Sequence, residues 1–553
     1  MIKIYRKTCM NLLIYVFLFV IGKGTARADE VTRVFLFAGQ SNMVGSDANP
    51  KQIDEFPSFK GAAKPQNDVL FSCHTGNGPG ETKGWGPLKP RDSFGPELTF
   101  ARQVKTRVNG PIAIIKFAVG GTTVAFDWNP DAPDQGQKLY PKFLKFVRES
   151  LKDLEKRGIK YRLEGVMWHQ GENDMLDRNL YKKYSIGLSS LIRRLREDLN
   201  APQLKWYIAE ISEKGIWGMD HRHNLGVLHQ QQALVLQSDP LLCWVPTSHL
   251  AFAVMGNGQP HYHFGTQGQL QLGEAFAAAY LRDVGQSVDQ TGKSSKNGFP
   301  AGEKSKVRLF VLAGQRNMEG EDAFLSEIPK VAGFETIKQS QERVLFRYSL
   351  GGGVKASSGW EPLGPVGLLG NFGPELSFGN ILRHSIDAKT AIGILKFTHS
   401  GAQGPDWSPK DSPESHRSLY PKLLAFISQA REDLKKRGLD SSLEGVFWHT
   451  GENDTFYSPY AQNNAKWMKN LIEQMRLDLQ QPYLHWYISG QHKDSPWRNI
   501  ELVNQGLKDL AETLPNITII PTSDLPHEKV HFGTRGTILL GKKMAETYLQ
   551  NNK

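Results

Sequence analysis

The feature that most constrains this chain is an internal repeat. Residues 34–45 read Val-Phe-Leu-Phe-Ala-Gly-Gln-Ser-Asn-Met-Val-Gly, and residues 307–320 read Val-Arg-Leu-Phe-Val-Leu-Ala-Gly-Gln-Arg-Asn-Met-Glu-Gly. Further motifs recur in the same order, namely Gly84–Leu88 with Gly359–Leu363, Phe94–Leu98 with Phe372–Leu376, Leu139–Lys142 with Leu419–Lys422, Trp168–His169 with Trp448–His449, and His263–Thr266 with His531–Thr534. A chain that repeats itself over such a long period folds into tandem copies of one unit.

The repeat divides the 553 residues into four parts. We predict a signal peptide over residues 1–28, a first domain over 29–284, a linker over 285–306 and a second domain over 307–553. The first part has a basic start, a short apolar run and Ala26-Arg27-Ala28, which fits a cleavage site after Ala28. A membrane anchor is the alternative, but the run is short for a bilayer span. We therefore expect a secreted or periplasmic protein that does not stay in the membrane.

Charge and cysteine content limit the partners. Cleavage removes five basic residues and no acidic one, so the net charge falls from +11 to +6. No dense Lys/Arg block is present, and we expect no nucleic-acid partner. Cys73 and Cys243 remain, either as one disulfide or as two thiols. There is no CxxC pair or His-rich tract, so we expect neither a metal nor a cofactor.

Apolar runs alternate with amphipathic segments in each copy, which is typical of βαβ units around a parallel sheet. We predict two three-layer α/β/α sandwiches of the doubly wound type. In the first copy the expected strands are 34–39, 112–119, 163–168 and 204–211, and the expected helices are 141–158, 180–199 and 267–281.

Polar residues follow several of these strands in the first copy. Ser41 follows the first strand, Gly120-Gly121 the second and His169 to Asp174 the third, while His263 precedes the last helix. Parallel sheets place their chemistry at the carboxyl ends of the strands. A serine nucleophile needs a base and donors for an oxyanion, which this set can supply.

These motifs resemble those of the SGNH (GDSL-like) hydrolase superfamily and, within it, the sialate O-acetylesterase-like carbohydrate esterases. The resemblance implies that Ser41 is the nucleophile and His263 the base. It implies that Gly121 and either Asn173 or Gln170 hold the oxyanion, with Asn173 favoured because Gly171-Glu172-Asn173-Asp174 matches the superfamily's Gly-x-Asn-Asp. The implied reaction removes O-acetyl groups from an acetylated carbohydrate without a metal.

One position departs from this family pattern. The family places an Asp three residues before the catalytic His, where this chain has Pro260. Glu172 and Asp174 are the candidate replacements that we consider, together with a backbone carbonyl that holds the imidazole of a Ser-His dyad. Loss of the orienting acid lowers kcat by about 10⁴ in a serine protease triad.

The second copy departs at the nucleophile. Arg316 stands where the first copy has Ser41, and its guanidinium stays protonated. Ser400-Gly401 replaces the Gly-Gly turn, whereas Asn453 and His531 persist and Glu528 lies three residues before His531. We predict a pseudoenzyme domain, in which Arg316 could hold a carboxylate or sulfate if it lies in an open cleft.

Two functions from different classes remain open. The first is a carbohydrate O-acetylesterase whose first domain is active, and the second is a glycan-binding protein in which both sites have decayed. A lipid or thioester hydrolase on the same scaffold is less favoured. The sugar, the acetylated position and the oligomeric state are not predicted.

Overall fold

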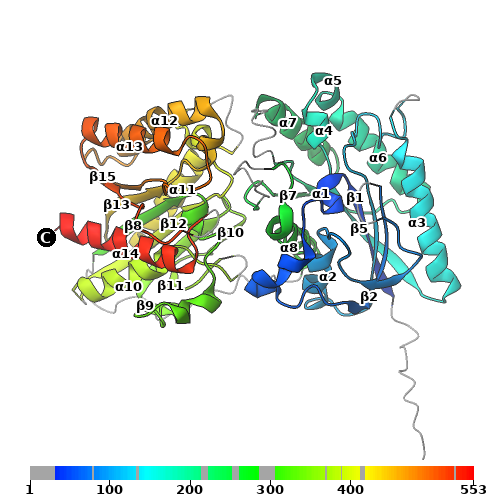
Figure 1. Cartoon of the computed structure of the whole chain (residues 1–553), viewed down its shortest axis with the longest axis horizontal. Coiled ribbons are helices and arrows are strands. Elements are labelled where there is room, and N and C mark those ends of the chain that lie inside the picture. The colour runs from blue at the N-terminus through cyan, green and yellow to red at the C-terminus, as the bar shows by residue number, and fades with distance from the viewer. Residues whose placement is uncertain are drawn as a thin grey trace, which may run out of the picture.

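The computed structural model describes residues 31–76, 80–132, 136–212, 222–251, 261–285, 306–367, 370–387, 389–410, 417–527 and 531–552. It contains two α/β domains side by side, with the first coloured blue to green and the second yellow-green to red in Figure 1. The predicted signal peptide lies outside the described residues, as does the predicted linker apart from Gly285 and Lys306.

The first domain is built on a seven-stranded sheet with the order β3-β2-β4-β1-β5-β6-β7. All neighbours are parallel except β2 and β3. The strands are β1 (Thr32–Gly39), β2 (Gln66–Thr75), β3 (Gly86–Leu88), β4 (Ile112–Ala118), β5 (Tyr161–His169), β6 (Trp206–Ala209) and β7 (Leu242–Val245). Strand β1 lies at the centre because its neighbours β4 and β5 both pair with it in parallel.

Helices cover both faces of this sheet. Helices α2 and α8 pack on one face, and α3, α6 and α7 pack on the other. The helices are α1 (Ser41–Val44), α2 (Glu97–Lys105), α3 (Leu139–Lys156), α4 (Glu172–Met175), α5 (Arg178–Tyr181), α6 (Tyr184–Asp198), α7 (Arg222–Ser238) and α8 (Gly265–Asp283), with short 3-10 turns η1 (Pro50–Glu55) and η2 (Pro57–Phe59).

The second domain repeats this plan with an eight-stranded sheet of order β10-β9-β12-β8-β13-β14-β15, with β11 paired to β9. Its strands are β8 (Val307–Gly314), β9 (Gln341–Leu350), β10 (Lys355–Ala356), β11 (Glu361–Leu363), β12 (Ala391–Thr398), β13 (Ser441–His449), β14 (Trp486–Ser489) and β15 (Ile517–Ile520). Its helices are α9 (Arg316–Glu319), α10 (Glu375–Ser385), α11 (Leu419–Lys436), α12 (Ser458–Asp478), α13 (Ile500–Thr513) and α14 (Thr534–Asn551), with turns η3 (Leu325–Lys330), η4 (Gly404–Trp407) and η5 (Asn453–Phe456).

The two faces of β1 explain why its sequence is a continuous apolar run. Val34, Leu36 and Ala38 pack under α3, α6 and α7, whereas Phe35 and Phe37 pack under α2 and α8. A strand covered on both faces cannot alternate with polar residues. The prediction of two three-layer α/β domains with mostly parallel sheets is confirmed.

Cys73 and Cys243 are both free thiols. They lie on β2 and β7, which are separated by four intervening strands of the sheet. At about 4.8 Å per strand spacing they are about 24 Å apart. The open question of a disulfide is therefore answered in favour of two thiols.

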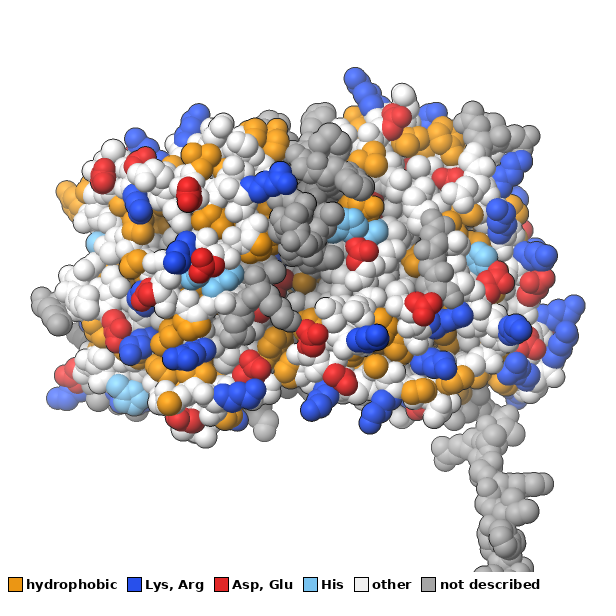
Figure 2. Space-filling view, in the orientation of Figure 1, with side chains coloured by type: hydrophobic (Ala, Val, Ile, Leu, Met, Phe, Trp, Pro, Cys, Tyr) orange, Lys and Arg blue, Asp and Glu red, His pale blue; other side chains and the backbone are white. Residues whose placement is uncertain are grey.

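The described residues include no helix with the length and hydropathy that a bilayer crossing requires. On the face shown in Figure 2, basic and acidic side chains are interspersed over both domains rather than gathered by sign.

Candidate active site

Ser41 begins α1 directly after the central strand β1. The turn that places it there requires Gly39, which has φ +151° and on which a Cβ would lie 2.0 Å from the carbonyl oxygen of His169. Ser41 is 7% exposed. The nucleophile predicted from the sequence thus lies at the carboxyl end of the sheet.

The neighbouring residue brings the predicted base beside it. The side chain of Asn42 accepts a hydrogen bond from the backbone N–H of Phe264 at 3.1 Å and donates one to the carbonyl oxygen of Tyr262 at 3.3 Å. Tyr262 and Phe264 are the two residues that flank His263. Although Ser41 and His263 are far apart in the sequence, Asn42 therefore holds them in one site.

The group that faces Nδ1 of His263 is Asp47, whose Oδ2 lies 2.9 Å away. Burial by itself would raise the pKa of Asp47, but the hydrogen bond and charge of His263, with those of His261, outweigh it and lower the pKa below 3.8. Nε2 of His263 is buried and has no hydrogen-bond partner within the described part of the chain. One ring nitrogen is therefore held by a carboxylate, and the other is left to act as a base.

Asp47 corrects the expectation that Glu172 or Asp174 replaces the missing acid. Glu172 instead accepts a hydrogen bond from Nδ2 of Asn42 at 2.6 Å. Asp174 accepts hydrogen bonds from the N–H groups of Val124 and Ala125 at 2.9 and 3.0 Å. Burial raises the pKa of Asp174 to about 6. Both acids brace loops of the site, whereas Pro260 lies outside the described residues.

The candidate oxyanion donors fall into two groups. Gly121 is exposed at the end of β4 with φ +72°, a conformation that favours glycine. Asn173 is half-buried, and its Oδ1 accepts a hydrogen bond from Gln40 at 3.0 Å, which leaves its Nδ2 without a partner among the residues described.

Gln170 is fully buried and is already engaged. Its Nε2 donates to the carbonyl oxygen of Thr122 at 2.8 Å and to Asp174 at 2.6 Å. The geometry therefore agrees with the preference for Asn173 over Gln170 as the side-chain donor.

A buried ion pair supports α1 from below. Nζ of Lys116, on β4, donates to Glu97 at 2.8 Å and to the carbonyl oxygen of Val44 at 3.0 Å. Val44 is the last residue of the short helix that Ser41 begins. The repeated Phe-Gly-Pro-Glu-Leu motif thus supplies the carboxylate that anchors the nucleophile helix through a lysine.

The second domain closes the equivalent position. Arg316 is 1% exposed, and its Nη1 donates to both carboxylate oxygens of Glu321 at 3.1 and 3.3 Å. Its Nε donates to Oδ1 of Asn453 at 3.0 Å. The guanidinium is thus committed to internal partners, which corrects the expectation that Arg316 could hold an external carboxylate or sulfate.

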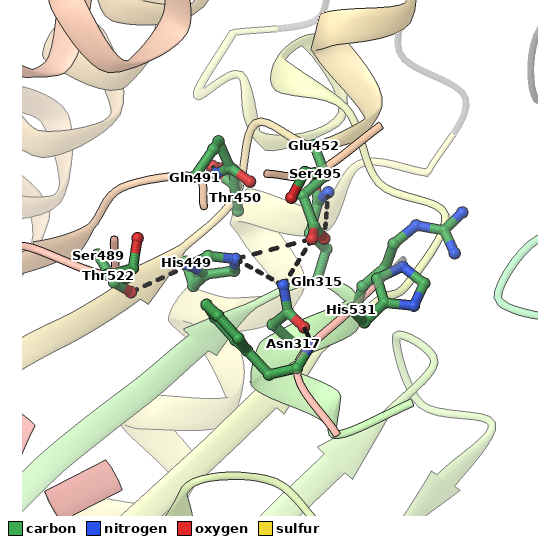
Figure 3. A network of polar contacts seen from close by, with 12 residues as sticks. Gln315, Asn317, His449, Thr450, Glu452, Ser489, Gln491, Ser495, Thr522 and His531 are labelled. Carbon is green, nitrogen blue, oxygen red and sulfur yellow. Dashed lines mark hydrogen bonds and ion pairs between the residues drawn. The ribbon is translucent and has the colours of Figure 1, made fainter. Parts of the chain in front are cut away.

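The remaining second-domain residues keep the shape of the site without its nucleophile (Figure 3). Asn317 donates to Glu452 at 2.6 Å, as Asn42 does to Glu172, and Nδ1 of His531 lies 2.9 Å from Asp322. Burial by itself lowers the pKa of His531, but the charge and hydrogen bond of Asp322 raise it above 6.5 overall. Glu528 lies outside the described residues.

The first domain also covers this edge of the second. Gly401, which corresponds to Gly121, is buried so tightly that a Cβ on it would lie 1.9 Å from the carbonyl oxygen of Ser248. Nε2 of Gln267 donates to the carbonyl oxygen of Glu321 at 3.3 Å. The duplicated site is therefore part of the interface between the domains.

Comparison with known proteins bears on the reading of this geometry. The family model described as "Carbohydrate esterase, sialic acid-specific acetylesterase" matches residues 31–282 and 306–550. The chain belongs to this family, in two tandem copies. A protein of Arabidopsis thaliana named as a probable carbohydrate esterase is 29% identical over 194 residues. The match spans 34% of this chain and 63% of that relative, which is less than two thirds of the relative's length.

Solved structures give likenesses of one domain's size. A protein from Arabidopsis thaliana has 22% identity and a TM-score of 0.35, with 44% of this chain and 98% of that chain covered. NanS has 18% identity and a TM-score of 0.34, with 45% and 98% covered. A carbohydrate acetylesterase from Xanthomonas citri has 16% identity and a TM-score of 0.32, with 43% and 55% covered.

Proposed function

We propose that the first domain of this family member removes acetyl groups from an acetylated sugar or polysaccharide through an acyl-enzyme on Ser41. The observation that carries the proposal is the state of His263. Its Nδ1 faces Asp47 at 2.9 Å, and its Nε2 has no partner among the described residues. Asn42 holds this imidazole next to Ser41.

The reaction follows from these positions. The Oγ atom of Ser41 attacks the acetyl carbonyl carbon while its proton passes to Nε2 of His263, and Asp47 stabilises the resulting imidazolium. The amide of Gly121 and Nδ2 of Asn173 hold the oxyanion. His263 then protonates the departing sugar hydroxyl, and a water activated by the same nitrogen releases acetate.

The second domain serves in this proposal as a pseudoenzyme that contributes an interface rather than catalysis. Arg316 occupies the nucleophile position, and Ser248 of the first domain covers Gly401. The rival function, a glycan-binding protein with two decayed sites, drew its support from Pro260 and Arg316. Asp47 provides a carboxylate for the first site, so only the second retains that support.

A matched pair of variants tests the proposal. We expect wild-type protein to release acetate from p-nitrophenyl acetate and from acetylated xylan, and His263→Ala to abolish this release. His531→Ala, the same change in the second domain, should leave it unchanged. An alkyl fluorophosphonate should label Ser41, as mapped by mass spectrometry of peptides, and Ser41→Ala should prevent both labelling and turnover.

The contrary result is equally specific. If wild type and Ser41→Ala release acetate at the same rate, the esterase proposal is wrong. Retention of both proteins by acetylated xylan in affinity electrophoresis would then favour glycan binding. We further propose that the chain is exported and cleaved after Ala28, and the intact mass of the mature protein tests this.

A further inference from the structure

Asp47 is shared by two histidines rather than one. Its Oδ2 is in contact with Nδ1 of His261 and lies 2.9 Å from Nδ1 of His263. The two imidazole rings meet edge to face with centroids 4.7 Å apart. Each residue offers one ligand atom, and these three atoms lie within 4.8 Å of one another. Within the described part of the chain this is the single cluster of His, Cys, Asp and Glu with such spacing.

We infer that Asp47, His261 and His263 form a binding site for a zinc ion. Two imidazole nitrogens and one carboxylate oxygen are a donor set that Zn²⁺ prefers, and three protein ligands leave the fourth position for water. Bond lengths near 2.0–2.1 Å in a tetrahedron place ligand atoms about 3.3 Å apart. The 2.9 Å between His263 and Asp47 lies close to that spacing, so small rotations of the rings admit the ion.

The cluster can be reached from solvent. The Asp47 side chain is 39% exposed, that of His261 18% and that of His263 9%. The ion can therefore approach over Asp47, and water can fill its remaining position.

The second domain provides an internal comparison. It keeps the Asp322–His531 pair at 2.9 Å, but the residue two positions before His531 is Lys529, where the first domain has His261. A lysine ammonium offers no lone pair and repels a cation. The expected stoichiometry is therefore one ion per chain at this kind of site.

Occupancy of the site would inhibit the esterase, a consequence that rests on the proposed function. In the metal-free site Nδ1 of His263 carries the proton that faces Asp47, and Nε2 has the lone pair that accepts the proton of Ser41. Zinc takes the lone pair of Nδ1, so the proton of the neutral imidazole moves through solvent to Nε2 of the same ring. A ring in that tautomer cannot act as the base, and the carboxylate that orients it is occupied by the metal.

Metal binding is tested without reference to turnover. Zinc chloride is titrated by calorimetry into the untagged, chelator-treated full chain near neutral pH, and Co²⁺ is added separately to read the visible absorption of a tetrahedral site. We expect one saturable site, lost in His261→Gln and unaffected in Asp322→Asn. Circular dichroism shows whether each variant is folded. Absence of a saturable site in wild type, or the same binding in folded His261→Gln, would overturn the assignment.

Acetate release provides a second, separable measurement. We expect zinc to inhibit wild type and EDTA to restore it, with an inhibition constant that matches the calorimetric dissociation constant. If the chain binds zinc at this cluster but releases no acetate in its metal-free form, the metal site stands and the esterase proposal fails. If acetate release is unaffected at saturating zinc, the cluster is not the site that the metal occupies.

Discussion

Replacement of Asp47 by Asn tests the catalytic arrangement most directly. Asp47 has φ +63°, a conformation that Asn also tolerates, so the backbone should not change. The variant keeps the size of the side chain and removes the charge that faces His263 at 2.9 Å. The imidazolium formed during acylation then loses its stabilising partner.

The size of the effect follows from the exposure of this carboxylate. Two unit charges about 4 Å apart interact by about 4 kcal/mol at an effective dielectric constant of 20 and by about 1 kcal/mol in bulk water. Asp47 is 39% exposed, so its contribution lies between these limits. At about 1.36 kcal/mol per tenfold change in rate, kcat should fall by about fivefold to about 10³-fold. This is less than the loss of about 10⁴ for the corresponding change in a serine protease triad.

The measurement is kcat for acetate release from p-nitrophenyl acetate, with Asp322→Asn as the matched control. Both variants remove a carboxylate that lies 2.9 Å from a histidine Nδ1, but only one lies in a domain with a serine nucleophile. We expect Asp322→Asn to retain wild-type kcat. Equal kcat in Asp47→Asn and wild type, or equal losses in the two variants, would refute the assignment of Asp47 as the orienting acid.

Three further changes have defined outcomes. Lys116→Met should lower the free energy of unfolding by about 3–5 kcal/mol in urea titrations, because it leaves Glu97 charged and buried, and Lys116→Met/Glu97→Leu should recover most of it. Gly121→Ala should lower the stability by about 1–2 kcal/mol, because its φ is +72°, and should reduce kcat more than it raises KM. The pKa of His531 is raised by Asp322, so this pair stabilises the fold fully below pH 6.5 and less as the pH rises through the folded-state pKa. The loss of stability in Asp322→Asn should therefore be larger near about pH 6 than near about pH 9.

The fold was predictable where one physical cause determines the local sequence. A strand buried on both faces must be apolar throughout, and a glycine is needed where β1 turns against His169. Strand β2 was not predicted, because it begins with the polar residues Gln66-Asn67-Asp68 and becomes apolar only later. The expected helix over 180–199 is divided into α5 and α6. Lys116 in a buried strand is understood only through Glu97, which comes from another element.

The site was predictable as far as the motifs reached. Ser41 and His263 were found, but the acid was sought only near His263 and in the loop after β5. Asp47 follows the nucleophile and lies 216 residues from its histidine, so no local pattern links them. The repeat contained the missing signal, since Gly45-Ser46-Asp47 corresponds to Gly320-Glu321-Asp322 and the aspartate is common to both.

The ion pair between Arg316 and Glu321 has a consequence for the history of this duplication. Both positions differ from the first copy, where serines stand at 41 and 46, and the two charges are buried together. Reversion of Arg316 alone would strand a carboxylate in the interior, and reversion of Glu321 alone would strand a guanidinium. Evolution back to a serine nucleophile must therefore cross an unstable intermediate or change both codons together, which makes the loss of this ancestral residue difficult to reverse.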